Sequence, residues 1–220
     1  MSLVRVHNFS ISLDGFGVGE DQRLDAPFGH AGMRLVEWSF ATRTQQINMH
    51  GSASPEAAAG SAGVDEVFAS RWGASVGAEI MGRHKFAPKS EPWPNEEWRG
   101  WWGENPPFHT PVIVLTHHPR EPLVMDGGNT FYFVDAEPAE ALERARSLAG
   151  GRDIRIGGGV QTIRDFLQAD LIDEMHLAVV PIVLGRGERL WDGLEAIEER
   201  FTIESVSSPS GVIHLTFWRR

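Results

Sequence analysis

Three consecutive glycines, Gly157, Gly158 and Gly159, follow an apolar segment at 153–156 and precede a segment with helical spacing. Because glycine has no Cβ, a ligand can approach the backbone of such a turn closely. The free N–H groups at the start of a following helix attract an anion, and the helix dipole adds to that attraction. The segment therefore predicts a phosphate-binding turn, although a purely structural turn between a strand and a helix would have the same sequence.

A run of three basic residues, Arg83, His84 and Lys85, follows an apolar segment that ends at Gly82. Arginine presents a planar fork of donors that matches phosphate oxygens. If the apolar segment is a strand, the three side chains follow its end, and we expect them to form a compact anion site. A third apolar segment ends in the same way, with the polar pair Thr116-His117.

The glycine turn does not match the common nucleotide motifs. A dinucleotide fingerprint needs a glycine where this chain has Thr162, and an acidic residue at the end of the next strand. The expected strand 175–184 contains no acid, and no Gly-Lys-Ser/Thr sequence is present. The turn is therefore either a different phosphate cradle or structural.

Strands and helices alternate along most of the chain, and the C-terminal part forms a hairpin around a Ser-Pro-Ser-Gly turn. This pattern predicts an α/β fold with a mixed sheet in one domain over residues 1–220. We expect strands at 3–12, 79–82, 111–116, 130–134, 154–156, 175–184, 201–206 and 212–218, and helices at 33–47, 65–76, 137–149 and 161–171. The Gly- and Ser-rich segment 50–63 is expected to be a loop, and the Trp- and Pro-rich segment 87–110 an ordered one.

The composition excludes several kinds of site. The chain of 220 residues has no cysteine, so disulfides and thiolate zinc sites are excluded, and its nine scattered histidines predict no metal site. A net charge of −10 disfavours binding to nucleic acid or to an anionic membrane. No apolar run has transmembrane length and no signal-peptide pattern is present, so a cytoplasmic protein is expected.

Three of these segments together resemble the dihydrofolate reductase superfamily: residues 80–84, the strand that ends at Thr116-His117, and the turn at 157–159. The segments 12–15 (Ser-Leu-Asp-Gly) and 180–187 resemble more specifically the reductase domain of the bifunctional riboflavin deaminase–reductase and its stand-alone relatives. The resemblance implies a three-layer α-β-α fold with a mixed, mostly parallel sheet and a C-terminal antiparallel hairpin. The zinc-binding motifs of the deaminase half are absent.

The resemblance also implies a binding site for NADPH. The glycine turn and the start of the next helix would hold the pyrophosphate, the segment after Gly82 would contact phosphates, and Thr116 and His117 would lie beside the adenosine ribose and its 2′-phosphate. Basic side chains near that phosphate predict tighter binding of NADPH than of NADH. The implied cofactor residues are Gly82, Arg83, His84, Lys85, Thr116, His117, Gly157, Gly158, Gly159, Val160, Gln161 and Thr162.

The same resemblance places the substrate beside the loop at 12–18 and the first long helix. Ser12, Phe16 and Trp38 are then candidates for substrate binding, and Asp14 and Glu37 for catalysis. Each acid has a simpler interpretation, since aspartate is common in turns of the Leu-Asp-Gly type and Glu37 would suit a surface position. The chain also has Ile156 where riboflavin reductases carry an acid before the glycine turn.

The predicted function is an NADPH-dependent reductase that transfers hydride to a small heterocyclic or ribosylaminopyrimidine-like substrate. The resemblance implies a reaction like that of a 5-amino-6-(5-phosphoribosylamino)uracil reductase of riboflavin biosynthesis. A dihydrofolate or pterin reductase-like enzyme and a non-catalytic NADPH-binding protein are the alternatives. Related reductases are commonly homodimers, and the hairpin residues Ile213, Leu215, Phe217 and Trp218 predict a dimer built on the C-terminal half of the sheet.

Overall fold

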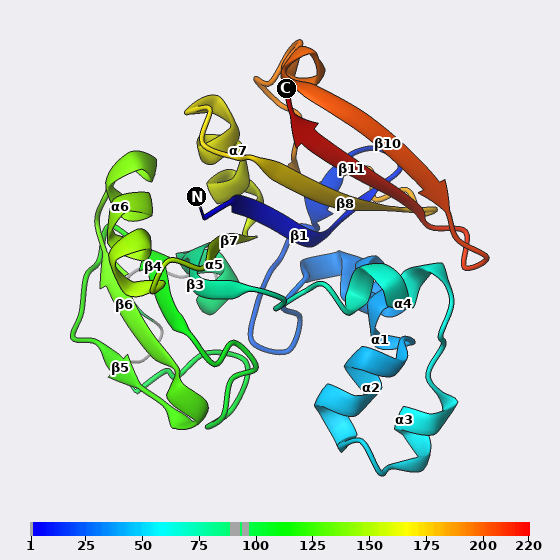
Figure 1. Ribbon diagram of the computed structural model, residues 1–220, viewed down its shortest axis with the longest axis horizontal. Helices are drawn as coiled ribbons and strands as arrows, with labels where there is room; N and C mark the ends of the chain where they lie inside the picture. The colour runs from blue at the N-terminus through cyan, green and yellow to red at the C-terminus, as the bar shows by residue number, and fades with distance from the viewer. Residues whose placement is uncertain (1, 89–92, 94–96) are drawn as a thin grey trace.

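A sheet of nine strands forms the centre of the computed structural model, which describes residues 2–88, 93 and 97–220 (Figure 1). The strand order is β10-β11-β8-β1-β7-β3-β4-β6-β5. In chain order, the strands are β1 Val4–Ser12, β3 Val76–Gly82, β4 Pro111–Leu115, β5 Leu123–Val124, β6 Thr130–Val134, β7 Asp153–Gly158, β8 Glu174–Val180, β10 Phe201–Ser207 and β11 Ile213–Arg219.

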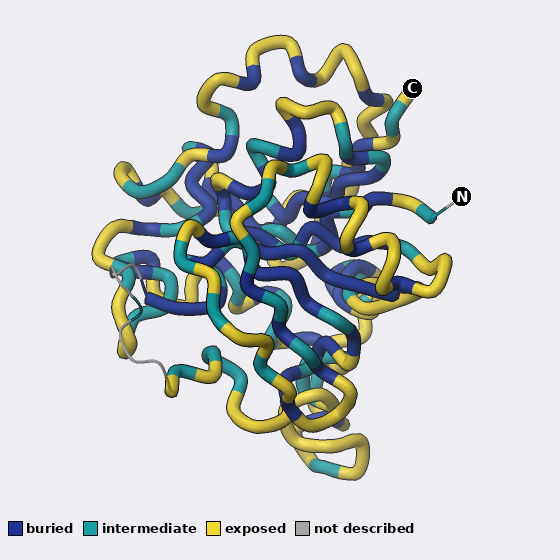
Figure 2. The backbone as a smooth tube through the Cα atoms, turned by 90° about the vertical axis from the view of Figure 1, so that its left-hand side faces the viewer, coloured by how far each residue is buried: buried dark blue, intermediate teal, exposed yellow. Residues whose placement is uncertain are grey.

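The strands from β8 to β6 run parallel to one another, and β5, β11 and β10 pair in antiparallel fashion at the two ends. The predicted mixed, mostly parallel sheet with a C-terminal hairpin is therefore confirmed. The central strands are buried over nearly their whole length, as expected for parallel strands covered on both faces (Figure 2).

One face of the sheet is covered by α6 (Pro138–Leu148) and α7 (Val160–Gln168) (Figure 1). Both helices turn apolar residues at helical spacing toward the strands, which is what the sequence periodicity indicated. The resulting core joins Ala141, Leu142, Ala145, Ile163, Phe166 and Leu167 of the helices to Val6, Ile80, Ile154, Ile156 and Leu177 of the strands.

The opposite face carries two separate groups of elements. Helices α1 (Glu37–Phe40) and α4 (Val64–Ala69) pack beside β8, together with α2 (Arg43–His50) and α3 (Pro55–Ala59). The short helix α5 (Arg83–Phe86) and aromatic residues of the Trp-rich segment pack on β3, β4 and β6. Strand β2 (Phe16–Val18) pairs with β9 (Glu188–Arg189), and the 3-10 helices are η1 Gly29–Leu35, η2 Asp126–Gly128 and η3 Ile197–Arg200.

The sheet opens between these two groups, at the contact of β1 with β7. These strands pair only at Val4 with Ile154 and at Arg5 with Arg155, whereas β1 continues along β8 as far as Ser12. A β-bulge shifts the β1 register between Val6 and Phe9, and Asn8 within it has a left-handed φ of 56°. The separation of β1 from β7 leaves room for a cavity in the middle of this face.

Three stretches of the helical group differ from the sequence predictions. The helix expected at 65–76 ends at Ala69, and Val76 already begins β3. The helix expected at 33–47 is divided into η1, α1 and α2, because Gly32 has a positive φ and Thr42 caps a new helix through its hydroxyl. The loop expected at 50–63 contains α3, which Ser54 caps and Pro55 begins. Part of the ordered loop predicted at 87–110 lies outside the described residues, at 89–92 and 94–96.

No helix in the described part of the chain is both long and apolar enough to cross a membrane.

The C-terminal strands have less exposed apolar surface than the hairpin sequence indicated. Leu215 and Phe217 pack into the protein's own core. Three other side chains of the hairpin are exposed: Ile203 by 41%, and Ile213 and Trp218 by 39% each. β10 also ends the sheet, so its outer edge has no partner strand among the described residues. We propose that a second copy of the chain covers this end of the sheet.

Sedimentation tests this assembly. We expect the wild type to sediment as a dimer at micromolar concentration, and Ile203→Asp or Trp218→Asp to shift it toward the monomer because each places a charge in the interface. Val124→Asp is the matched control, since Val124 is exposed on β5 at the opposite end of the sheet. A wild-type protein that sediments as a monomer contradicts the proposal.

Candidate functional site

A cavity of about 570 Å³ lies where β1 separates from β7. Its floor is formed by residues 7–10 of β1, by Arg155 and residues 157–160 at the end of β7 and the start of α7, and by His84 and Lys85. Segment 27–49 and segment 101–108 form two walls. The cavity is thus built at the carboxyl end of a parallel strand, the usual place for a ligand in an open α/β sheet. Of the predicted site residues, it brings together His84, Lys85, Gly157, Gly158, Gly159 and Val160.

The glycine turn is shaped for a close approach to its backbone. Gly158 has a φ of +111°, which side chains with a Cβ rarely adopt. A Cβ on Gly157 would collide with the carboxylate of Glu79 and with the Lys85 ammonium group, 2.6 Å from its Nζ. Gly159 precedes the first turn of α7, and a Cβ there would meet no atom within 4 Å. The helix start is therefore open toward the cavity and suits an anion.

A buried carboxylate ties the turn to the neighbouring strand. Glu79 of β3 is 1% exposed, and it pairs with Lys85 at 2.9 Å and with Arg155 of β7. Lys85 Nζ also donates to the carbonyl oxygen of Gly157 at 2.7 Å. The guanidinium of Arg155 stacks on Trp72 at 3.8 Å from the ring centre and donates to the Trp72 carbonyl. Two cations share one carboxylate here, so this group carries a surplus positive charge beside the turn.

The surplus charge depends on the protonation of Lys85. Burial lowers the pKa of the Lys85 ammonium group below its ordinary value, and the nearby Arg155 lowers it further. Glu79 acts in the opposite direction through its charge and its hydrogen bond. Lys85 is thus a proton-carrying group on the cavity floor, next to the glycine turn.

The compact anion site expected from three consecutive basic residues is not formed. Residues 83–86 make one turn of helix α5, so their side chains point in different directions. Arg83 is buried with its guanidinium over the Trp93 ring, 4.6 Å from its centre, and does not line the cavity. His84 lines the cavity, and its carbonyl accepts from Gln22, while Lys85 turns toward Glu79.

The other predicted cofactor residues do not line the cavity. Gly82 packs against the Thr162 hydroxyl at the start of α7, so two of the predicted segments are in contact. Gln161 is exposed and donates to Asp165. At the end of β4, Thr116 is buried, while the His117 side chain is 90% exposed and lies 3.0 Å from Asp135.

Ser12 and Asp14 organise the loop after β1. The Ser12 hydroxyl donates to Asp14 and accepts from the N–H of Phe16, and Asp14 accepts from the N–H groups of Leu184 and Gly185. Burial raises the pKa of Asp14, but these hydrogen bonds lower it to about 2. Ser12, Asp14 and Phe16 do not line the cavity; this arrangement matches the turn-forming interpretation of Asp14.

The two candidates from the first helical segment do not line the cavity either. Trp38 is buried against β8 and donates its indole N–H to the Ser10 hydroxyl. Glu37 is exposed, as a surface acid would be. The segment nevertheless contributes to the site, because its neighbours Met33, Val36 and Phe40 line the cavity.

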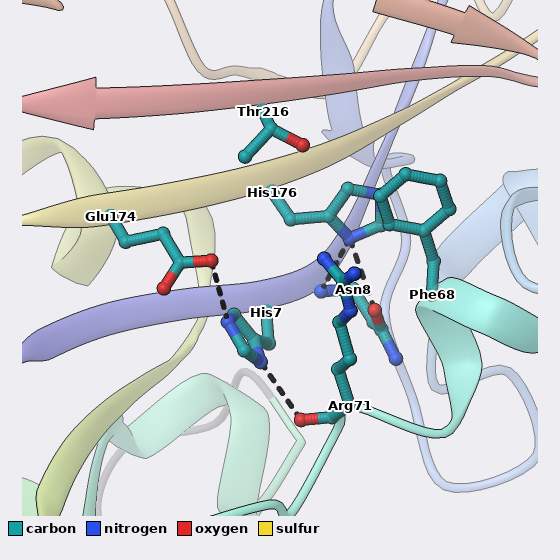
Figure 3. A pocket seen from close by; sticks show the side chains of 7 residues that line it. All are labelled: His7, Asn8, Phe68, Arg71, Glu174, His176 and Thr216. Carbon is teal, nitrogen blue, oxygen red and sulfur yellow. Dashed lines mark hydrogen bonds and ion pairs between the residues drawn. The ribbon is translucent and has the colours of Figure 1, made fainter. Parts of the chain in front are cut away.

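Sequence reasoning did not identify the polar cluster behind the β1 bulge (Figure 3). His7 Nδ1 donates to the Arg71 carbonyl at 2.9 Å, and Nε2 lies 3.4 Å from Glu174. Burial raises the pKa of Glu174, but His7 and Arg5 lower it below its ordinary value. His7 and Asn8 line the cavity as well, so this cluster supports its floor.

A chain of buried histidines continues from Asn8 away from the cavity. His176 is within 3.0 Å of both Asn8 and His214, and His214 is 2.8 Å from Asp65. Both rings stack on Phe68. Burial lowers the pKa of His176 well below its ordinary value, and that of His214 as well, although Asp65 opposes the latter. These contacts join residues from four distant segments, so no local sequence signal could have found them.

Comparison with known proteins gives a family match over nearly the whole chain. A family model described as the RibD C-terminal domain matches residues 6–215. Two uncharacterised proteins of Bacillus subtilis (strain 168) are similar over shorter segments: YwjB is 38% identical over 58 residues, which are 26% of this chain and 33% of YwjB. YyaP is 31% identical over 92 residues, 40% of this chain and 47% of YyaP. The aligned segments thus cover less than half of either relative.

Solved structures show the same fold at low sequence identity. A provisionally named riboflavin biosynthesis protein from Shewanella sp. PV-4 has a TM-score of 0.52 and 22% identity, with 100% of this chain and 99% of that chain covered. A pyrimidine reductase-like protein from Corynebacterium diphtheriae has a TM-score of 0.51 and 15% identity, with 100% and 92% covered. A bifunctional deaminase/5-amino-6-(5-phosphoribosylamino)uracil reductase from Thermotoga maritima has a TM-score of 0.52 and 13% identity, and the match covers 100% of this chain and 57% of that chain.

Gly159 gives a direct test of the turn as a phosphate cradle. Gly159→Val places a side chain in open space, so the fold should remain intact while NADPH is excluded. Gly158→Val would strain the backbone instead, because of its positive φ. At a hundredfold excess over its dissociation constant, NADPH should stabilise the wild type by about 2.7 kcal/mol, and this gain should vanish in Gly159→Val.

The control for this experiment is Gly63→Val. Gly63 also precedes a helix, α4, and a Cβ there would likewise meet no atom within 4 Å. It does not line the cavity, so the variant should keep the full NADPH-induced shift in thermal unfolding. A full shift in Gly159→Val would place the phosphate site elsewhere.

Asp14 should give the protein a pH-dependent stability. Its pKa of about 2 in the fold is below the ordinary 3.8, so its contribution is present above pH 4 and is lost between about pH 4 and pH 2. Asp14→Asn should therefore lower the free energy of unfolding at pH 7 by roughly 1 kcal/mol, a value reduced for solvent screening, and weaken this pH dependence. Denaturant unfolding at several pH values measures this change in the free energy of unfolding. Asp25→Asn is the control, because the Asp25 side chain is exposed.

Proposed function

Because the chain belongs to the RibD C-terminal domain family, we propose that it is an NADPH-dependent reductase acting on a small heterocyclic substrate. The observation that carries the proposal is the glycine turn on the floor of the large cavity, with the start of α7 open beside it. This arrangement fits a dinucleotide pyrophosphate, because a Cβ-free backbone, helix N–H groups and a surplus cation meet at one place.

The fit assigns roles to particular residues. Gly158, Gly159 and Val160 would hold the pyrophosphate through their backbone, and Lys85 would contribute positive charge from the floor. Thr116 and His117, at the end of β4, would lie toward the ribose 2′-phosphate. When bound, NADPH supplies the hydride, while the protein supplies orientation and electrostatics.

The residues around the cavity suit a reduction. The aromatic wall residues Trp101, Trp102 and Phe108 exclude water from a bound substrate. Addition of hydride to a C=N or C=O bond also requires a proton on the nitrogen or oxygen. Lys85 Nζ holds a proton at the cavity floor, and its lowered pKa brings proton release closer to neutral pH. We assign Lys85 the role of proton donor.

The structure does not favour the pterin reductase alternative. That alternative relies on an acid in the pocket from the first helical segment, and Glu37 is exposed and does not line the cavity.

A turnover assay distinguishes the proposed reductase from a non-catalytic NADPH-binding protein. The rate of NADPH oxidation is measured by absorbance in the presence of a panel of heterocyclic carbonyl and imine compounds. For an active compound, this rate should exceed the rate without substrate. Lys85→Met should reduce that excess at least tenfold.

Cofactor selectivity gives a second test. We expect calorimetric titration to give tighter binding for NADPH than for NADH, because a 2′-phosphate near His117 gains a charge-assisted hydrogen bond. His117→Ala should weaken NADPH binding by about 1 kcal/mol and leave NADH binding unchanged. Asp135→Asn should tighten NADPH binding, because the Asp135 carboxylate competes with the 2′-phosphate for the His117 ring. Equal affinities of the wild type for the two cofactors would contradict the assignment.

A further inference from the structure

The charged residues that line the cavity all belong to its floor and to one edge, and the two walls are uncharged. Among the described lining residues, the charged or ionisable side chains are His7, His84, Lys85, Arg155 and Glu188. The lining residues of segment 27–49 and of segment 101–108 are all apolar or neutral polar side chains.

The basic side chains of the floor are already bound to protein groups. Arg155 is held by Glu79, the Trp72 carbonyl and the Trp72 ring, and is 2% exposed. Lys85 is held by Glu79 and the Gly157 carbonyl, directly beside the turn that would take the cofactor pyrophosphate. His7 is held between the Arg71 carbonyl and Glu174. The surplus positive charge of Lys85 and Arg155 over Glu79 therefore lies beside the glycine turn, on the cofactor side of the cavity.

The walls offer flat apolar surface and neutral hydrogen-bonding groups. Phe40, Trp102 and Phe108 present rings against which a planar molecule can pack. Met33 and Met49 are 44% and 45% exposed, and their flexible side chains can adapt to a ligand. A phosphate enclosed between such walls would lose its hydration without gaining a cation in return, which is costly.

We propose that the substrate is an uncharged, planar aromatic or heteroaromatic compound without a phosphate group. This inference rests on the proposed function, because it describes the compound that the reductase would reduce. It differs from the phosphoribosylaminouracil named for the Thermotoga maritima protein. The neutral amides Gln45, Asn48 and Asn105 would pair with carbonyl or N–H groups at the edge of the ring.

A matched pair of aromatic probes tests the proposal without turnover. 1-Naphthol and 1-naphthyl phosphate share a planar ring system and differ in the phosphate alone. Calorimetric titration of the full chain, saturated with NADP⁺, should give at least tenfold tighter binding of naphthol. Equal or tighter binding of naphthyl phosphate overturns the proposal, and so does the absence of binding for both probes at millimolar concentration.

A charge placed on the wall should reverse the preference. Met33→Lys puts an ammonium group beside the cavity, so naphthyl phosphate should bind at least tenfold more tightly to this variant than to the wild type, and naphthol more weakly. Val124→Lys is the control, because it adds the same charge at an exposed position on β5, outside the cavity lining. If both variants change the preference equally, the walls do not select the ligand.

NADPH titration of the same samples separates this inference from the proposed function. A preference for naphthol, measured without the cofactor, in a protein that does not bind NADPH would contradict the reductase and leave the uncharged pocket in place. No preference in a protein that binds NADPH would contradict the inference alone.

Discussion

The ion-pair group around Glu79 is the interaction on which the arrangement of the site depends. A carboxylate buried in the sheet is unstable unless cations and hydrogen bonds compensate for its lost hydration. Arg155 from the next strand and Lys85 from the following helix provide that compensation. Lys85 in turn fixes the Gly157 carbonyl, so the charge balance of β3 sets the position of the glycine turn. The same group leaves no room for a side chain at residue 157.

The parts of the fold that the sequence predicted are those determined by local patterns. The apolar spacing in α6 and α7, the strand at 130–134 and the C-terminal hairpin needed no distant partner to be recognised. The glycine turn was identified because its chemistry lies in consecutive residues. The broken helix at 33–47 was missed because the left-handed Gly32 and the cap at Thr42 interrupt an otherwise helical pattern.

The rest of the site depends on contacts that sequence spacing does not encode. Glu79 lies in an apolar strand, and its importance comes from Arg155, 76 residues away. The three basic residues after Gly82 were predicted to act together, but one helical turn directs Arg83 toward Trp93 and Lys85 toward Glu79. The walls come from irregular segments without periodicity, so their uncharged character becomes apparent only when the fold brings them together.

The short pairing between β1 and β7 divides the sheet mechanically into two leaves. One leaf contains β10, β11, β8 and β1, the other contains β7, β3, β4, β6 and β5, and their seam has the two residue pairs Val4–Ile154 and Arg5–Arg155. Beyond the seam, β1 and β7 are not paired, and the cavity lies where they separate. A ligand that contacts both leaves thus acts as a brace, and its binding energy stiffens the sheet where the backbone does not.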